Sequence, residues 1–478
     1  MLFNSIEYIF IFVPFVIIIY FLFNKNKLII LAKSWLIFSS LIFYGWLQPK
    51  YILILLFSIF FNFSIGRTLN QNYKINKKFV LFFGIFVNLG ILAYFKYMDF
   101  FISELNTFCH LNIDLLKIAL PIGISFYTFQ QISYLSDSYQ GKTKEYDFLN
   151  YTLFVVFFPQ LVAGPIVRHQ EVIPQFQNLK NKFINWKNIS TGLFLFTIGL
   201  FKKVVIADTL AIYANLGFSI DSGLSFLEAW LSILSYTFQI YYDFSGYTDM
   251  ALGIALMFNI KLPKNFNNPY FAIDIQDFWR RWHMTLSLFL KDYVYIPLGG
   301  NRKGAIRTYI NIFIVFFICG FWHGAGVLFI LWGIVHGIAM IINRLWKSLN
   351  INMPILLARF LTFTFISLSW ILFRAENFTT AKLLYKSAFC CYGFAIPKIY
   401  GSIIEFSPKI SSIEGYETLL LFFIPLLIAI IYINSIHKLK YDFKPNKTFA
   451  NIILILFVIS ILVIINPDCS SEFIYFNF

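Results

Sequence analysis

The sequence predicts an all-α, polytopic integral membrane protein. Hydrophobic residues make up 59% of its 478 positions and charged residues only 13%, whereas soluble domains average roughly 45–50% apolar and about 25% charged residues. Many apolar stretches reach the roughly 20 residues that a helix needs to cross about 30 Å of hydrocarbon. The Lys and Arg residues behind the net charge of +15 gather in short clusters between these stretches. Cytoplasmic loops collect such clusters, so the charge indicates a lipid bilayer as partner and no nucleic acid.

The first apolar run, from Ser5 to Phe23, is expected to stay in the protein as a membrane helix. Lys25 and Lys27 follow it directly and no cleavage pattern does, which indicates a multi-pass protein with an extracytoplasmic N-terminus. Further apolar runs lie at about 28–47, 51–66, 79–96, 119–135, 148–165, 190–210, 224–258, 306–320, 324–345, 355–373, 416–435 and 448–466. We expect roughly 11 to 13 membrane helices, some of them re-entrant or interfacial.

No linker, repeat or low-complexity tract divides the chain, so a single domain over residues 1–478 is expected. The loop 168–189 mixes basic and aromatic residues and forms either amphipathic helices in the membrane interface or a solvated basic loop. Lys far outnumbers Arg, and Ile, Phe and Asn are abundant, as is typical of an AT-rich bacterial genome.

The sequence signals neither a disulfide framework nor a metal site. Five scattered cysteines make no CxxC pair, so we expect them to pack in the core. No HExxH motif occurs and the histidines lack a compact ligand spacing, so no metal and no bound cofactor are expected. A P-loop is also missing.

His323 is the strongest catalytic candidate. It lies in the run Gly320-Phe321-Trp322-His323-Gly324-Ala325-Gly326, and ionisable groups in apolar segments cost on the order of 2.5–3.5 kcal/mol each on insertion. The flanking glycines permit a broken helix and a close approach of ligand or backbone. A neutral imidazole can serve as a general base without the cost of burying a permanent charge, although a histidine can also be buried for packing alone.

A second histidine near His323 is expected to be His283 and not His336. His336 follows His323 by 13 residues, which on one straight helix puts the two imidazoles roughly 20 Å apart on nearly opposite sides. They cannot share a reacting atom unless the helix is broken. His336 is therefore expected to be structural, with His283 brought in by the fold.

The segment from Asp274 to Gly300 is too charged to span a membrane. An amphipathic or re-entrant helix bordering a water-accessible cavity fits it better. Its arginines either take part in substrate binding or anchor the segment at the interface by snorkelling. We take the following basic residues here and just beyond as substrate-binding candidates: Arg280, Arg281, Lys291 and Arg302.

Two carboxylates, Asp243 and Asp249, interrupt the apolar stretch that begins at Tyr241. Asp243 and Tyr247 share a helix face, while Asp249 points elsewhere. Asp243 is a further substrate-binding candidate, because these groups either line a polar tunnel or pair with an arginine of the 280 region. Ser245 lacks the context of a hydrolase nucleophile.

Five ordered motifs resemble the membrane-bound O-acyltransferase family, within it the bacterial branch of alginate and peptidoglycan O-acetyltransferases and teichoic-acid D-alanyl transfer proteins. They are Leu120–Asp137 (LPIGISFYTFQQISYLSD), Phe157–Arg168 (FFPQLVAGPIVR), Tyr241–Ile260 (YYDFSGYTDMALGIALMFNI), Phe278–Gly304 (FWRRWHMTLSLFLKDYVYIPLGGNRKG) and Gly320–Gly337 (GFWHGAGVLFILWGIVHG). The motif-bearing core is therefore about 120–345.

The resemblance implies helices around a central funnel or tunnel, with an acyl thioester donor entering from the cytoplasm. It implies that His323, in the Trp-His-Gly position, is the catalytic histidine and that His283, in the Arg-Trp-His position, is the second polar residue of the site. Acetyl-CoA is the expected donor, docking its phosphates at the basic border. His323 would act as a base, while His283 orients the acceptor or polarises the carbonyl. A transient acyl-histidine is the alternative route.

The same resemblance implies a bacterial cell inner membrane protein that passes its acetyl group to an extracytoplasmic O-acetyltransferase or acyl-accepting protein. Peptidoglycan or an alginate-like polysaccharide is the expected final acceptor. Two other functions stay open: a lipid-modifying acyltransferase of the same family, and a transporter without group transfer. A transporter would be expected to show inverted repeats, and the sequence shows none.

Overall fold

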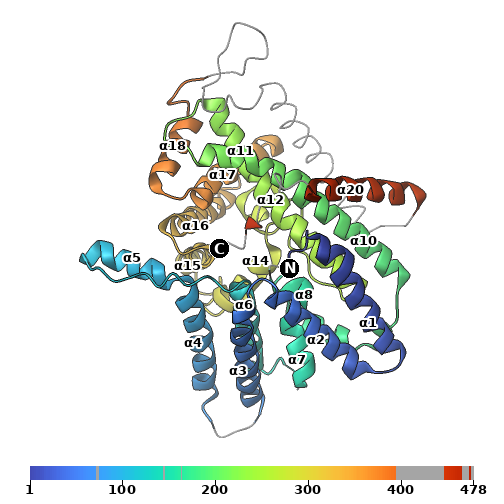
Figure 1. The fold of residues 1–478 in the computed structure, drawn as a ribbon. Helices are drawn as coiled ribbons and strands as arrows, with labels where there is room; N and C mark the ends of the chain where they lie inside the picture. Colours follow the sequence, from blue (N-terminus) through green and yellow to red (C-terminus); the bar gives the residue numbers. More distant parts are fainter. Residues whose placement is uncertain (72–74, 144–145, 163, 395–445, 466–472, 475–478) are drawn as a thin grey trace.

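The computed structural model describes all residues except 72–74, 144–145, 163, 395–445, 466–472 and 475–478 (Figure 1). Regular structure in this described part is entirely helical, which confirms the predicted all-α class. Eight of the described helical segments are long and apolar enough to cross a bilayer: Tyr8–Lys25, Pro49–Asn70, Lys77–Lys96, Trp186–Phe218, Ala305–His323, Val327–Ser348, Ile355–Arg374 and Lys447–Ile465. The chain is therefore a polytopic membrane protein.

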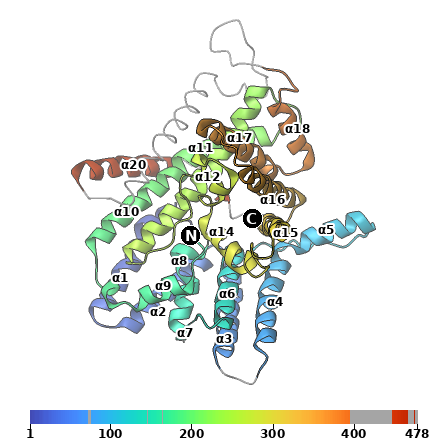
Figure 2. The same cartoon turned by 180° about the vertical axis from the view of Figure 1, so that it is seen from behind.

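The N-terminal third forms two helical groups (Figures 1 and 2). The first contains η1 (Tyr8–Phe12), α1 (Val13–Lys25) and α2 (Ile29–Gly45), and the second contains η2 (Pro49–Tyr51), α3 (Ile52–Asn70), α4 (Lys77–Lys96) and α6 (Ile124–Tyr139). A buried pair of amides joins α3 to α4: each of Asn62 and Asn88 donates to the other, at 3.0 and 2.7 Å. Between α4 and α6, α5 (Met98–Cys109) points sideways out of the group.

The expected membrane segment 148–165 is not one helix. It consists of α7 (Phe148–Val156) and α8 (Phe158–Leu161), which begins with Pro159 in its first turn. Proline lacks a backbone N–H and disfavours helix in the residue before it, so a break here is expected. Of the two alternatives for 168–189, the first part of this segment is helical, as α9 (His169–Gln177) and η3 (Leu179–Lys182). One face of α9 is buried, whereas Leu179, Phe183 and Trp186 beyond it are exposed.

Three long helical pieces form the centre: α10 (Trp186–Phe201), α11 (Asp208–Phe218) and α12 (Phe226–Met257), with the π-helical turn η4 (Lys202–Ala207) joining the first two. The backbones of α10 and α12 touch at glycines. A Cβ atom on Gly199 would lie 2.5 Å from the carbonyl oxygen of Gly246, and one on Gly192 would lie 2.6 Å from that of Gly253. Small residues allow such close packing of membrane helices, and α12 is consequently buried along most of its length.

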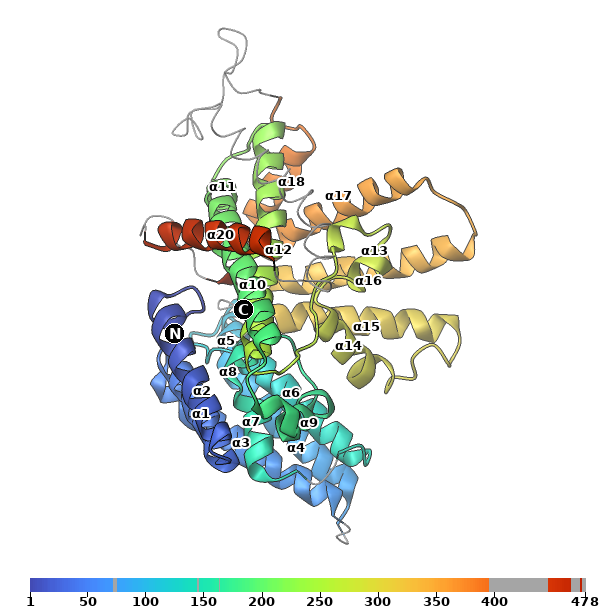
Figure 3. The ribbon, with the colours of Figure 1, turned by 90° about the vertical axis from the view of Figure 1, so that its right-hand side faces the viewer.

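Residues 269–374 form a layer beside this centre (Figure 3). Short pieces come first: η5 (Pro269–Phe271), α13 (Ile275–Trp279), α14 (Met284–Leu290) and η6 (Lys291–Tyr295). The long helices α15 (Ala305–His323), α16 (Val327–Ser348) and α17 (Ile355–Arg374) then lie side by side, followed by α18 (Phe378–Ala388) and α20 (Lys447–Ile465). The charged segment 274–300 is thus broken into short helices, and the expected run 416–435 lies outside the described residues.

The cysteine expectation is wrong in part. Cys319 is buried in α15, but Cys109, Cys390 and Cys391 are exposed. Cys109 is the last residue of α5, and Cys390 and Cys391 follow the end of α18. Cys469 lies outside the described residues.

Candidate functional site

His323 is the last residue of α15, and only 2% of its surface is exposed. Gly324 and Gly326 are extended, and α16 begins at Val327. The break between the two helices therefore falls directly at the histidine. Aromatic rings enclose its imidazole, with centroids at 4.9 Å (Trp322), 5.2 Å (Trp332) and 5.1 Å (Phe373). The side chain is held in one place by rings that exclude water.

A close contact between α15 and α16 fixes the position of this turn. A Cβ atom built on Gly320 would lie 2.4 Å from the carbonyl oxygen of Phe329 and 2.9 Å from the Cα atom of Gly333. Both are backbone atoms, which cannot move aside without shifting a helix. Gly320 therefore allows the antiparallel hairpin that presents His323.

Replacing Gly320 by alanine should push α16 away from α15 and displace His323. Overpacking of this kind costs about 1–3 kcal/mol, so the detergent-solubilised variant should melt at a lower temperature and transfer acyl groups more slowly. Gly90→Ala on α4 is the matched control, because nothing lies within 4 Å of a Cβ atom there. Equal melting temperatures for the two variants would contradict the packing role of Gly320.

His283 stands at the start of α14 with φ 41° and ψ 54°, in the left-handed region. Non-glycine residues held there cost of order 1–3 kcal/mol and gather at functional sites. The buried Asn265 holds the following turn: its carbonyl oxygen accepts from Met284 N at 2.9 Å, and its side-chain oxygen accepts from Thr285 Oγ1 at 2.5 Å. The imidazole itself is fully buried against the Phe244 ring, with centroids 4.8 Å apart.

The structure brings His283 and His323 to the same place. Trp322 lies between them, with its ring 6.3 Å from the centroid of His283 and 4.9 Å from that of His323. Two buried imidazoles from separate segments thus lie against the same Trp322 ring. We call the aromatic surroundings of these two imidazoles the histidine pocket.

His336 has both ring nitrogens engaged by the protein. Trp279 Nε1 donates to Nδ1 at 3.2 Å, and Nε2 lies 3.1 Å from Ser369 Oγ, whose own proton goes to the carbonyl oxygen of Ile366. His336 is therefore the Nε2-protonated tautomer, tying α13 to α16 and α17. Its ring packs 4.6 Å from Trp332, on the other side of which lies His323.

The basic candidates lie at or near the protein surface. Arg280, Lys291 and Arg302 are exposed, and Arg281 is half-buried with its Nε 2.8 Å from Asp277 Oδ1. The arginines lie only two and three residues before the buried His283 in sequence. Short helices thus connect an exposed cationic border to the buried imidazole.

Asp243 does not pair with an arginine of the 280 region. Its Oδ1 lies 2.7 Å from Lys203 Nζ, which also contacts Asp208 Oδ1 at 2.8 Å, and Lys202 pairs with Asp249 at 2.8 Å. Of the two open alternatives for Asp243, the arginine pair is not formed, because η4 turns two consecutive lysines into the core against α12. These charges form a buried cluster between α10, α11 and α12.

A cavity of about 790 Å³ reaches the wall of the histidine pocket. Phe373, which contacts the His323 ring at 5.1 Å, also lines the cavity. The other lining residues include Glu104, Gln239, Gly326, Leu328 and Ile474. A substrate group could therefore approach the pocket from this side.

Comparison with known proteins decides the family. The profile of MBOAT, the membrane-bound O-acyltransferase family, matches residues 110–355, which include His283 and His323. This chain belongs to the membrane-bound O-acyltransferase family. It is accordingly an acyltransferase, as the motifs predicted.

Three relatives illustrate the branch within the family. The chain is 45% identical to a peptidoglycan O-acetyltransferase of Helicobacter pylori, over 86% of this chain and 84% of the relative. It is 35% identical to a probable alginate O-acetylase AlgI of Pseudomonas putida over the full length of both. A teichoic acid D-alanyltransferase of Bacillus subtilis is 30% identical over 54% of this chain and 69% of the relative.

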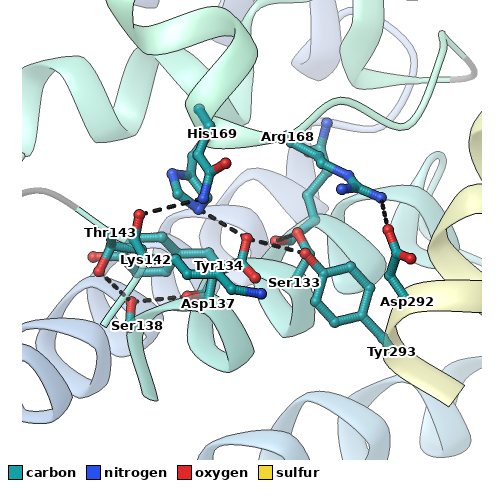
Figure 4. Close-up of polar contacts among 12 residues, drawn as sticks. Ser133, Tyr134, Asp137, Ser138, Lys142, Thr143, Arg168, His169, Asp292 and Tyr293 are labelled. Atoms are coloured by element: carbon teal, nitrogen blue, oxygen red, sulfur yellow. Dashed lines mark hydrogen bonds and ion pairs between the residues drawn. The ribbon is translucent and has the colours of Figure 1, made fainter. Parts of the chain in front are cut away.

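This O-acyltransferase contains a buried polar network that the sequence analysis missed (Figure 4). Asp137 Oδ2 accepts from His169 Nε2 at 3.1 Å and from the Tyr293 hydroxyl at 3.0 Å, and Tyr146 bonds to His169 Nδ1 at 2.9 Å. Burial and the Asp137 carboxylate raise the pKa of the Tyr293 phenol. The network joins α6, α9 and η6.

A neighbouring ion pair between Arg168 and Asp292 joins the start of α9 to η6. The signal in the sequence was periodicity: His169 precedes Val172, Ile173 and Phe176 at helical spacing, and all are buried. Because a histidine on the apolar face of α9 is buried, its ring nitrogens need hydrogen-bond partners from other parts of the protein. Asp137, at the end of its own motif, supplies one.

The C-terminal residues Phe473 and Ile474 also belong to the site wall of this O-acyltransferase. The Phe473 ring stacks on Tyr247 at 4.4 Å and lies 6.2 Å from Phe244, which contacts His283. The backbone N–H of Ile474 donates to Asp243 Oδ2 at 2.8 Å. Asp243 therefore links the buried charge cluster to the chain's end, a contact that no local sequence pattern indicated.

Proposed function

We propose that this chain is an O-acetyltransferase that moves an acetyl group across the bacterial inner membrane for O-acetylation of peptidoglycan. The observation that carries the proposal is the 45% identity, over most of both chains, to a peptidoglycan O-acetyltransferase. An alginate-like exported polysaccharide is the second acceptor, favoured by the full-length match to a probable alginate O-acetylase. The N-terminus is proposed to be extracytoplasmic, since Lys25 and Lys27 follow the first span.

The catalytic step uses His323 as a general base. Its imidazole takes the proton of an acceptor hydroxyl, whose oxygen attacks the carbonyl carbon of an acetyl thioester. The carbon–sulfur bond breaks, a carbon–oxygen ester bond forms, and the proton passes from the imidazolium to the leaving thiolate. His283 orients the acceptor or polarises the carbonyl. The ring-lined pocket supports this assignment, because electrostatic interactions are stronger where water is excluded.

The donor is proposed to be acetyl-CoA, entering from the cytoplasm. The exposed basic residues Arg280, Lys291 and Arg302 lie where phosphates could be bound before the thioester reaches His283. A transient acetyl-His323 is the alternative route. The acceptor hydroxyl is proposed to belong to an extracytoplasmic O-acetyltransferase or acyl-accepting protein, which then modifies the polymer.

Deletion of the gene should remove ester-linked acetate from the cell wall, measured as acetate released by mild base from purified peptidoglycan. Restoring the wild-type gene should return it. In membrane vesicles supplied with labelled acetyl-CoA, label should move to a partner protein or glycan. Label in phospholipid would instead support a lipid-modifying acyltransferase, and solute flux without transfer would support a transporter. Unchanged wall acetate together with loss of acetate from an exported polysaccharide would select the second acceptor.

A further inference from the structure

The C-terminal end of α15 is capped by side chains from a distant part of the chain. The last four carbonyl groups of an α-helix have no partner within the helix, and no water satisfies them inside a bilayer. In α15 the carbonyl oxygens of Phe321, Trp322 and His323 all accept hydrogen bonds from Lys96 or Tyr97, at the junction of α4 and α5. The helix end that carries the candidate base is therefore held from outside.

Lys96 makes the larger share of these contacts. Its Nζ atom lies 2.5 Å from the Trp322 carbonyl oxygen and 3.2 Å from that of His323, with Ser125 Oγ at 3.5 Å. The ammonium group also lies 5.6 Å from the centroid of the Trp322 ring. None of the ion pairs within the described residues involves Lys96. Backbone oxygens and ring faces thus replace the carboxylate that a lysine at this depth would be expected to have.

Tyr97 completes the cap. Its hydroxyl donates to the carbonyl oxygen of Phe321 at 2.9 Å, and its ring stacks on the Phe321 ring with centroids 4.3 Å apart. Two consecutive residues therefore donate hydrogen bonds to the carbonyl oxygens of three consecutive residues of α15. Lys96 also lines a cavity of about 320 Å³ beside Gly324 and Ala325, so these hydrogen bonds lie at the turn that follows His323.

The charge of Lys96 has a physical role at this place. The C-terminus of a helix carries a partial negative charge, which a cation stabilises, most strongly where the geometry is partly buried. Ionisable side chains within membrane segments are expensive and mark functional places. Positive residues at the opposite end of α4, such as Lys78, are exposed and fit a solvated loop. Lys96 does not fit that explanation, because its ammonium group is directed into the protein.

We propose that Lys96, assisted by Tyr97, is a positioning residue that caps the end of α15 and fixes the place of His323. The proposal rests on the proposed role of His323 as the base. Without the cap, the last turn of α15 would unwind or shift toward other donors. Because a misplacement of about 1 Å can cost on the order of 100-fold in rate, even a small movement should be measurable.

The test compares Lys96→Met, Lys96→Arg and the control Lys78→Met in vesicles supplied with labelled acetyl-CoA. Lys96→Met should lower kcat on the order of 100-fold while leaving KM for the donor nearly unchanged, because donor binding lies elsewhere. Lys96→Arg, which keeps a cation and several N–H donors, should recover most of the loss. Lys78→Met should behave like wild type. Gel filtration in detergent gives the amount of folded protein, so that kcat refers to folded molecules.

Wild-type kcat for folded Lys96→Met would overturn the proposal, as would a loss that Lys96→Arg does not relieve. Should Lys96→Met fail to fold, Tyr97→Phe carries the test, since it removes one hydroxyl and keeps the ring stack. A several-fold lower kcat is then expected, and an unchanged kcat would overturn the positioning role of the cap. His323→Ala is measured alongside: retained transfer in that variant defeats the proposed function itself, whatever Lys96→Met does.

Discussion

Acetyl transfer by a His323→Ala variant should fall by roughly 10²–10⁴-fold per folded molecule, the range that a positioned general base contributes. His336 cannot take over at the same place, because both of its ring nitrogens are committed to Trp279 and Ser369, and His283 is proposed to orient the acceptor or polarise the carbonyl. The initial rate of label transfer from acetyl-CoA in vesicles measures the effect. Cell-wall acetate in a strain that carries only this variant measures the same loss in the cell.

The matched control is His110→Asn. His110 is exposed and has φ 53°, a left-handed conformation that asparagine tolerates. This variant should therefore fold and transfer acetyl groups at the wild-type rate. If His323→Ala retained more than a tenth of that rate with a normal amount of folded protein, the imidazole would not be the base.

A Lys203→Met variant should lose several kilocalories per mole of stability. Lys203 is nearly buried between Asp208 and Asp243, at 2.8 and 2.7 Å. Removing one partner of a buried ion pair costs about 3–5 kcal/mol, because an uncompensated charge stays behind. The expected result is a strong fall in the amount of folded protein in membranes and in its melting temperature in detergent.

Two further variants test whether the loss of stability comes from the uncompensated carboxylates or from any lysine substitution in this region. Lys187→Met on α10 removes an exposed lysine and should change little. Adding Asp208→Asn and Asp243→Asn to Lys203→Met removes the stranded carboxylates and should restore part of the folded protein. If Lys203→Met alone proved as stable as wild type, the cluster would contribute no net stabilisation.

Much of the fold followed from apolar run length and from glycine placement. The spans around α15 and α16 lie where hydropathy put them, and the helix is broken next to His323, which the flanking glycines permit. Because of the break, the spacing of 13 residues between His323 and His336 no longer places the two side chains on opposite sides of one helix. On one straight helix they would face opposite sides, whereas in the hairpin Trp332 contacts both rings.

What the sequence did not reveal depends on contacts between distant segments. For Asp243 the sequence suggested a place in a polar tunnel or an arginine partner, and only the packing of η4 against α12 reveals Lys203 as its partner. Lys96 sits at the end of an apolar run, where a lysine ordinarily snorkels to water. Its bonds to the end of α15 join residues 226 and 227 positions apart in the sequence, and no periodicity within α4 could indicate them.

At His283 the left-handed backbone conformation favours a residue other than histidine, whereas the proposed reaction needs an imidazole there. Glycine, or to a lesser extent asparagine, occupies φ near 41° at lower cost than histidine. A redesign guided by stability alone would therefore replace this residue early, and the product would be a sturdier protein without its second imidazole. Selection for stability and selection for a high turnover rate therefore favour different residues at this position.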